Sequence, residues 1–201
     1  MNVTLYKFVA GLVRIVLAPF FWPKVHGEEK MPKDTRIVVC GNHQSMLDPV
    51  FIGIFTRRPV HFMAKQQLFS FKPFGALLQK VGVFPVNREG TDIRALKTAL
   101  KVLKDEKALG IFPEGTRVTG IDLNNFKEGV AVIAMRAKSD ILPVRIHSSY
   151  RLFSRVDVIF RDPIRTENVI AGLSKEEATK ALTRAVFESI YEEELNGNHH
   201  R

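Results

Sequence analysis

His43 and Asp48 lie five positions apart, directly after the apolar segment 36–40. An imidazole titrates near neutral pH, so it can remove a proton from a hydroxyl group when a carboxylate holds its other ring nitrogen. In that arrangement the carboxylate fixes the tautomer of the ring and stabilises the imidazolium that forms. The pair therefore predicts general-base chemistry, with His43 as the base and Asp48 as its partner.

The same segment also has a purely structural interpretation. Asp48 precedes Pro49, and this pair commonly begins a helix, because the carboxylate accepts from free N–H groups and proline has none to lose. His43 would then be only a polar residue in the turn after Gly41. The two interpretations are compatible, because a carboxylate that caps a helix can also accept a hydrogen bond from an imidazole.

Three further segments place polar side chains directly after apolar runs. In 112–117, Phe-Pro-Glu-Gly-Thr-Arg, a glycine permits close approach of a ligand, and a hydroxyl and a guanidinium suited to phosphate follow it. Arg88 follows the run 81–86, and Lys65 follows the run 60–63. Each segment has an alternative interpretation as a plain turn whose exposed cation makes a surface ion pair.

Ser45 and Cys40 are conceivable nucleophiles for a hydrolase. The sequence contains no Gly-x-Ser-x-Gly segment, and Cys40 is expected to lie inside a buried strand, where a thiol is inert. A hydrolase that uses either residue as its nucleophile is therefore disfavoured. The sequence has no metal-binding cluster and no nucleotide-binding fingerprint, so we expect neither a metal nor a cofactor.

The elements that would position these side chains alternate along the chain. Apolar, β-branched runs predict strands, and helical patterns lie between them. This alternation predicts an α/β fold with a mixed, mainly parallel sheet flanked by helices, whose functional residues follow the carboxyl ends of strands. The strands are expected at 36–40, 60–63, 81–86, 109–112, 141–146 and 156–160, and the helices at 49–55, 67–79, 92–104, 128–138 and 174–194.

The segment 3–22 is apolar except for two charged residues, Lys7 and Arg14. On a helix these residues lie nearly on one line and leave a broad apolar face, which is typical of a helix in a membrane interface. Pro19 ends the helix after about 16 residues, or roughly 24 Å, which is short for a membrane span. A buried core helix is the alternative. We expect an amphipathic membrane-associating segment at 1–24, a turn region at 23–32, and one catalytic domain at 25–201.

The chain of 201 residues carries a net charge of +9, which favours an anionic partner. Its basic residues are scattered and form no nucleic-acid-binding motif, so we expect no nucleic-acid partner. The single cysteine excludes an intramolecular disulfide and favours a reducing, cytosol-facing location.

Together, these segments resemble the glycerolipid acyltransferases, specifically the lysophosphatidic acid acyltransferase group. The resemblance covers about residues 36–144, in four ordered motifs at 42–48, 82–88, 112–117 and 142–144. It implies the glycerolipid acyltransferase-like fold, and transfer of an acyl chain from acyl-CoA or acyl carrier protein to the sn-2 hydroxyl of 1-acyl-sn-glycerol 3-phosphate. The product would be phosphatidic acid, in phospholipid biosynthesis.

The resemblance also implies roles for individual residues. His43 would be the base and Asp48 its partner, and Lys127, in the segment 126–129, is a further candidate for phosphate. The enzyme would work on the membrane lipid surface, as a peripheral or monotopic protein at the cytoplasmic face of the cell membrane. The alternatives are another lysophospholipid or glycerol 3-phosphate as acceptor, or a non-catalytic lipid-binding homologue. The implied site for the acceptor's glycerol phosphate consists of Lys65, Arg88, Glu114, Gly115, Thr116 and Arg117.

Overall fold

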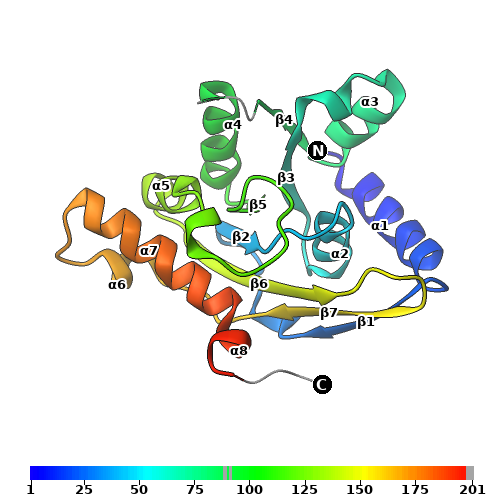
Figure 1. Cartoon of the computed structure of the whole chain (residues 1–201). Coiled ribbons are helices and arrows are strands. Elements are labelled where there is room, and N and C mark those ends of the chain that lie inside the picture. Colours follow the sequence, from blue (N-terminus) through cyan, green and yellow to red (C-terminus); the bar gives the residue numbers. More distant parts are fainter. Residues whose placement is uncertain (88–89, 91, 198–201) are drawn as a thin grey trace.

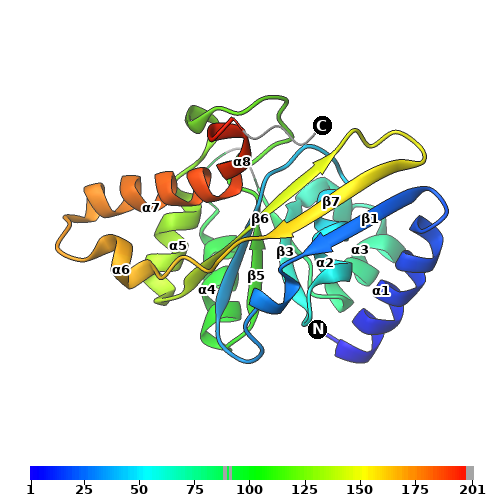
Figure 2. The same ribbon diagram turned by 90° about the horizontal axis from the view of Figure 1, so that it is seen from below.

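The computed structural model describes residues 1–87, 90 and 92–197, which form a seven-stranded sheet with helices on both faces (Figures 1 and 2). The strands are β1 (Phe21–His26), β2 (Ile37–Gly41), β3 (Val60–Lys65), β4 (Phe84–Val86), β5 (Ala108–Ile111), β6 (Asp140–Ser148) and β7 (Ser154–Phe160). The helices are α1 (Val3–Leu17), α2 (Asp48–Phe55), α3 (Lys72–Lys80), α4 (Ile93–Lys104), α5 (Gly129–Ala137), α6 (Thr166–Ile170), α7 (Lys175–Ile190) and α8 (Glu192–Leu195).

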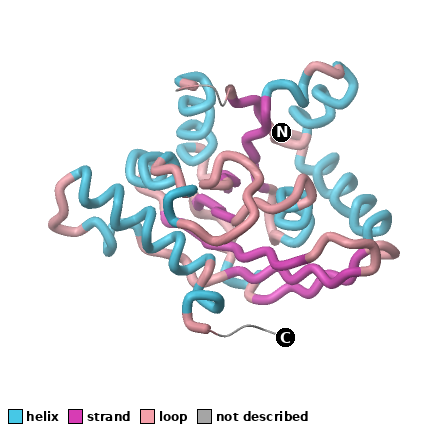
Figure 3. The backbone as a smooth tube through the Cα atoms, viewed as in Figure 1, coloured by secondary structure: helices cyan, strands magenta, loops and turns pink. Residues whose placement is uncertain are grey.

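The sheet has the order β1-β7-β6-β2-β5-β3-β4. Every neighbouring pair is parallel except β6 and β7, which are antiparallel. The expectation of a mixed, mainly parallel sheet flanked by helices is therefore confirmed. Because β2 to β6 run in one direction, their carboxyl ends meet at one edge of the sheet, which we call the carboxyl edge. The loops that leave this edge are pink in Figure 3.

Both faces of the sheet are buried. Val38 and Cys40 of β2 belong to an apolar cluster with α4, α5 and α7, whereas Ile37 and Val39 belong to a second cluster with α2 and β1. Alternate residues of one strand thus enter two cores, which is why β2 is a continuous apolar run rather than an alternating one. Figure 2 shows α4, α5 and α7 on one side of the sheet and α1 and α2 on the other.

The segment expected to be a turn region, 23–32, begins inside a strand instead. β1 pairs with β7 as an edge strand, with Phe21 opposite Ser154 and His26 opposite Ile159. Pro23 obscured this strand in the sequence, because proline is tolerated in a sheet mainly on an edge. Residue 24, where we expected the N-terminal segment to end, therefore lies within β1.

Two helices expected to be continuous are interrupted. The helix expected at 67–79 is divided into a 3-10 turn, Gln66–Phe69, and α3. Phe71 is extended, and Pro73 lies in the first turn of α3, where its missing N–H costs nothing. The helix expected at 174–194 begins with the Ser174 capping box but is interrupted at Tyr191, between α7 and α8. The short helix α6 was not expected.

Helix α1 lies against α2 at the surface. Asn2 caps it by accepting from the N–H of Leu5 (3.0 Å), and the hydroxyl of Tyr6 donates to the carbonyl oxygen of Gly53 in α2 (2.9 Å). No residue of α1, all of which the structure describes, is buried, so the alternative of a buried core helix is wrong. Within the described part of the chain, no helix combines the length and apolarity that crossing a bilayer requires.

Candidate active site

The end of β2 directs the chain across the carboxyl edge toward α2. A Cβ on Gly41 would lie 2.8 Å from Cδ1 of Ile52 and 3.3 Å from the ring of Phe112, so a side chain here would displace the end of Ile52. The side chain of Asn42 is fully buried and makes two hydrogen bonds with the backbone of Ile146 in β6: it donates to the carbonyl oxygen (3.0 Å) and accepts from the N–H (2.7 Å). The residue after Asn42 is thereby fixed at the edge of the sheet.

His43 and Asp48 are in direct contact. Nδ1 of the ring lies 2.9 Å from Oδ2 of Asp48, whose carboxylate is fully buried. The same oxygen accepts from the backbone N–H groups of Gln44 (2.7 Å) and Ser45 (2.6 Å). With a carboxylate as its partner, Nδ1 is the donor, and Nε2 is left as the acceptor that a general base needs.

The structure also decides between the two interpretations of Asp48. The N-cap of α2 is Leu47, which makes no side-chain capping bond, and Asp48 is the first residue of the helix. Its carboxylate turns back to the loop 43–45 rather than to the helix N–H groups. The interpretation of Asp48 as a helix cap is therefore wrong, whereas its contact with the imidazole is confirmed.

The ring of His43 is held from other sides as well. It stacks on Phe112, which follows β5, with ring centroids 4.4 Å apart and planes 26° apart. The carbonyl oxygen of His43 accepts from the N–H of Val118 (2.9 Å), so the loops after β2 and β5 lie side by side (Figure 1). His43 is 9% exposed, so only a small part of the residue reaches solvent. Such a ring is restricted in orientation but accessible to a bound hydroxyl group.

The loop after β5 is closed on itself. The N–H of Lys127 donates to the carbonyl oxygen of Pro113 (2.9 Å). Gly115 has φ +68°, and a Cβ there would lie 3.0 Å from Nζ of Lys127. The ammonium of Lys127 is thus brought against Gly115, beside the exposed side chains of Thr116 and Arg117.

Glu114 differs from its neighbours because its side chain points into the protein and is 3% exposed. Its Oε1 accepts from the hydroxyl of Tyr191 (3.1 Å). Burial raises the pKa of the Glu114 carboxyl, although the hydrogen bond from Tyr191 and the nearby His43 partly oppose this effect. The structure therefore does not bring this carboxylate to the surface where an acceptor phosphate would bind.

Tyr191 connects Glu114 to the C-terminal helices. The guanidinium of Arg145, in β6, lies over the Tyr191 ring at 4.7 Å, and its Nε donates to Glu194 of α8 (2.8 Å). Nothing in the sequence indicated this cluster, because its members come from β6, the loop after β5 and the end of α7. We infer that the cluster anchors the loop 112–118, which contacts His43.

The cationic candidates lie along the same edge. Lys65 ends β3, which is two strands from β2, or about 10 Å at the usual strand spacing. Lys65, Arg117 and Lys127 are exposed and make no ion pair with any residue that the structure describes. The alternative of a surface ion pair is thus wrong for Lys65 within the described part of the chain, whereas Arg117 is an exposed arginine after a turn, as its alternative interpretation has it. Arg88 lies outside the described residues.

The two conceivable nucleophiles are unsuited to that role. Cys40 is fully buried in β2, and burial raises the pKa of its thiol well above the ordinary value. The hydroxyl of Ser45 accepts from the N–H of Leu47 (3.2 Å) and serves the turn before α2. Neither side chain resembles an activated nucleophile, which would need a low pKa or a base at hydrogen-bonding distance.

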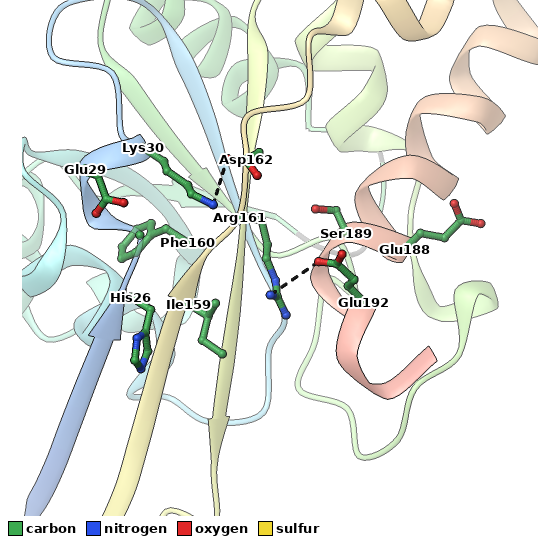
Figure 4. A pocket seen from close by; sticks show the side chains of 11 residues that line it. His26, Glu29, Lys30, Ile159, Phe160, Arg161, Asp162, Glu188, Ser189 and Glu192 are labelled. Atoms are coloured by element: carbon green, nitrogen blue, oxygen red, sulfur yellow. Dashed lines mark ion pairs between the residues drawn. The ribbon is translucent and has the colours of Figure 1, made fainter. Parts of the chain in front are cut away.

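Two surface hollows flank the sheet. One of about 460 Å³ lies at the carboxyl edge, where Gln66, Asn87 and Arg94 line it beside the end of β3. A larger one of about 650 Å³ lies at the opposite edge, between the ends of β1 and β7 and the C-terminal helices (Figure 4). Two ion pairs cross it, Lys30–Asp162 at 3.0 Å and Arg161–Glu192 at 3.7 Å. The chemistry of His43 is therefore remote from the larger hollow.

Comparison with known proteins gives consistent results. The family model described as Acyltransferase matches residues 23–147. The 1-acyl-sn-glycerol-3-phosphate acyltransferase of Bacillus subtilis is 32% identical over 194 residues, which are 94% of this chain and 96% of that protein. The protein of the same name from Streptococcus pneumoniae is 32% identical over 177 residues, which are 82% of this chain and 64% of that protein.

A solved structure has the same fold. The crystal structure of the 1-acyl-sn-glycerophosphate (LPA) acyltransferase from Thermotoga maritima superimposes with a TM-score of 0.73 at 24% sequence identity. The match covers 99% of this chain and 81% of that chain. The arrangement of the sheet and its helices is thus one already seen in a lipid-modifying enzyme.

Proposed function

Because this chain belongs to the acyltransferase family, we propose that it transfers an acyl chain from a thioester to the sn-2 hydroxyl of 1-acyl-sn-glycerol 3-phosphate. The product is phosphatidic acid, and the donor is acyl-CoA or the acylated form of acyl carrier protein. The observation that carries the proposal is the 2.9 Å contact between Nδ1 of His43 and the buried Asp48. Three exposed cations without ion-pair partners among the described residues, on loops or strand ends of the carboxyl edge, agree with it. The names of the similar proteins support the same acceptor.

The proposed reaction is a single displacement. Nε2 of His43 removes the proton from the sn-2 hydroxyl as its oxygen attacks the thioester carbonyl carbon, and Asp48 stabilises the imidazolium. The tetrahedral intermediate expels the thiolate, which takes up a proton, so that one ester forms for each thioester broken. A thiolate leaves readily, so no covalent acyl-enzyme is needed, in agreement with the buried Cys40.

We propose that Lys65, Arg117 and Lys127, together with Arg88 and the backbone and hydroxyl of 115–116, bind the acceptor's phosphate. Lys65, Arg117 and Lys127 have no ion-pair partner among the described residues, which favours a phosphomonoester, because each interaction with phosphate is charge-assisted. Glu114, being buried, contributes by holding the loop that carries Arg117.

Replacing Arg117 with alanine is expected to raise KM for lysophosphatidic acid about 10-fold, because a charge-assisted contact with phosphate is lost, and to change kcat little. Lys65→Ala is expected to act in the same direction. Steady-state kinetics with varied acceptor concentration measures both effects. Lys175→Ala, an exposed lysine at the start of α7, is the matched control and should behave as wild type. An unchanged KM in both site variants would contradict the phosphate site.

We also propose that the protein works as a peripheral protein on a lipid surface, at the cytoplasmic face of the membrane, with residues 1–24 as its attachment segment and 25–201 as the catalytic domain. The outer face of α1 exposes Phe8 (68%), Leu12 (50%) and Ile15 (72%). Phe71 and Phe74 of the α3 region are also exposed, and the N–H of Asn2 donates to the carbonyl oxygen of Lys80, so the two helices adjoin. Exposed apolar side chains on adjoining helices are typical of interfacial attachment.

The triple variant Phe8→Ser, Leu12→Ser, Ile15→Ser is expected to bind phosphatidylglycerol vesicles at least 10-fold more weakly, because apolar area no longer enters the interface. Vesicle co-sedimentation measures the binding. The control is Leu173→Ser with Leu195→Ser, which removes exposed apolar side chains far from α1. Equal binding by the triple variant and wild type would contradict attachment through α1.

The acceptor is tested by supplying one acyl-CoA with lysophosphatidic acid, lysophosphatidylcholine or glycerol 3-phosphate and identifying the products by mass spectrometry. The proposal predicts phosphatidic acid as the main product. Acylation of lysophosphatidylcholine or glycerol 3-phosphate at a higher kcat/KM would contradict the proposed acceptor. Binding of lysophosphatidic acid without product, with both CoA and acyl carrier protein donors, would indicate a non-catalytic homologue.

A further inference from the structure

The two oxygens of the Asp48 carboxylate have different partners. Oδ2 accepts from Nδ1 of His43 and from the backbone N–H groups of Gln44 and Ser45. Oδ1 accepts from the hydroxyl of Tyr150, which is its one donor among the described residues. Because Asp48 is fully buried, water cannot readily replace a lost donor. The orientation of the carboxylate is therefore fixed from both sides, and Tyr150 provides one of them.

Tyr150 comes from the loop between β6 and β7, more than a hundred residues from Asp48 in the sequence. Its backbone has φ +53°, in the left-handed region that residues other than glycine rarely adopt. Its N–H donates to the hydroxyl of Ser148 (3.0 Å), which stabilises the turn. Backbone strain of this kind persists where the surrounding structure requires one side-chain direction.

The ring of Tyr150 is clamped by two aromatic side chains. It meets Phe21 of β1 at a centroid distance of 6.3 Å and Phe51 of α2 at 6.2 Å. The hydroxyl is thus directed at Asp48 by packing that does not itself involve His43. Burial and the neighbouring Asp48 raise the pKa of the Tyr150 hydroxyl, so this group remains a proton donor throughout the working pH range.

We propose that Tyr150 is a positioning residue for the proposed acyl transfer. Its hydroxyl fixes the orientation of the Asp48 carboxylate and disperses its negative charge, and His43 needs both to act as the base. The inference rests on the proposed function. Without the hydroxyl, Oδ1 is a buried oxygen with no described donor, and the carboxylate is held through Oδ2 alone. Its negative charge is also less dispersed, so it stabilises the imidazolium more strongly.

Tyr150→Phe tests this role, because it keeps the clamped ring and deletes only the hydroxyl. Measured with lysophosphatidic acid and acyl-CoA, kcat is expected to fall about 10-fold, with KM for the acceptor unchanged within about 2-fold. The acid limb of the kcat–pH profile is expected to move upward by about 0.5 pH unit. Glu114, from the loop after β5, also interacts with His43, and it is the same in both proteins.

Thr56→Val is the control. Its hydroxyl donates to the carbonyl oxygen of Gly53 in the same helix, α2 (3.1 Å), but does not contact Asp48. This variant should keep kcat and the pH profile of wild type, which separates the positioning of Asp48 from general loosening of α2. Site-specific fluorotyrosine at position 150 preserves the shape and strengthens the donor, so the acid limb should move downward.

The outcomes are distinguishable. If Tyr150→Phe has the same kcat and the same acid limb as wild type, the role of Tyr150 is overturned and the proposed function is left intact. Equal losses in Tyr150→Phe and Thr56→Val, with no shift for fluorotyrosine, would also overturn it, because the effect would then be structural. A wild type that forms no phosphatidic acid would overturn the proposed function, and this inference with it.

Discussion

Replacing His43 with alanine is expected to lower the rate of acyl transfer to lysophosphatidic acid by at least about 1,000-fold, while the fold is preserved. The imidazole is the general base, and removal of such a group commonly costs 100- to 10,000-fold. Asp48 keeps the backbone N–H groups of Gln44 and Ser45 and the hydroxyl of Tyr150 as donors after the ring is removed, so the variant should remain folded. Labelled acyl transfer in detergent micelles, with circular dichroism of the same samples, measures both properties.

The control for this experiment is His147→Ala. His147 is an exposed residue near the end of β6 and makes no side-chain hydrogen bond with the described residues. Its removal should leave the rate within about 2-fold of wild type, as expected for an exposed surface substitution. A His43→Ala protein that keeps a tenth or more of wild-type activity would contradict the role of His43 as the base.

Replacing Asp48 with asparagine is expected to lower kcat about 100- to 1,000-fold and to destabilise the protein by about 2 kcal/mol. An amide has a single acceptor oxygen, whereas the Asp48 carboxylate accepts from Nδ1 of His43, two backbone N–H groups and Tyr150. Its NH2 group must face one of these donors, or force the imidazole into the tautomer in which Nε2 carries the proton. In that tautomer His43 cannot accept a proton from the acceptor hydroxyl.

The matched control is Asp105→Asn, which removes a carboxylate from an exposed pair with Lys101. Such pairs contribute little, so the free energy of unfolding should fall by less than about 1 kcal/mol and the rate should not change. Denaturant unfolding and steady-state kinetics measure both quantities. Wild-type kcat in Asp48→Asn would show that the buried carboxylate does not serve the base.

The His43–Asp48 contact could be predicted from the sequence because its members are close in the chain and follow a strongly apolar strand. The positions of Lys65 and of 112–117 were predictable for the same reason, since each follows a strand of the parallel part of the sheet. The carboxyl ends of such strands must meet at one edge. Local patterns and this topological rule were therefore sufficient for the centre of the site.

Tyr150 and Tyr191 could not be predicted in the same way. Their contacts with Asp48 and Glu114 join segments 102 and 77 residues apart, and no local pattern specifies such pairings. The only signal for Tyr150 was its place shortly after the expected strand 141–146. β1 was missed because its Pro23 and its largely exposed side chains are atypical of a buried parallel strand.

The measurement that tests the central claim most directly is the stoichiometry of the reaction with acyl-CoA, in the presence and absence of lysophosphatidic acid. If His43 activates the acceptor hydroxyl for direct transfer, free thiol appears only when the acceptor is present, in a 1:1 ratio to phosphatidic acid acylated at sn-2. Neither product should form with His43→Ala. Thiol release that does not depend on the acceptor, without phosphatidic acid, would contradict direct transfer and indicate a thioesterase.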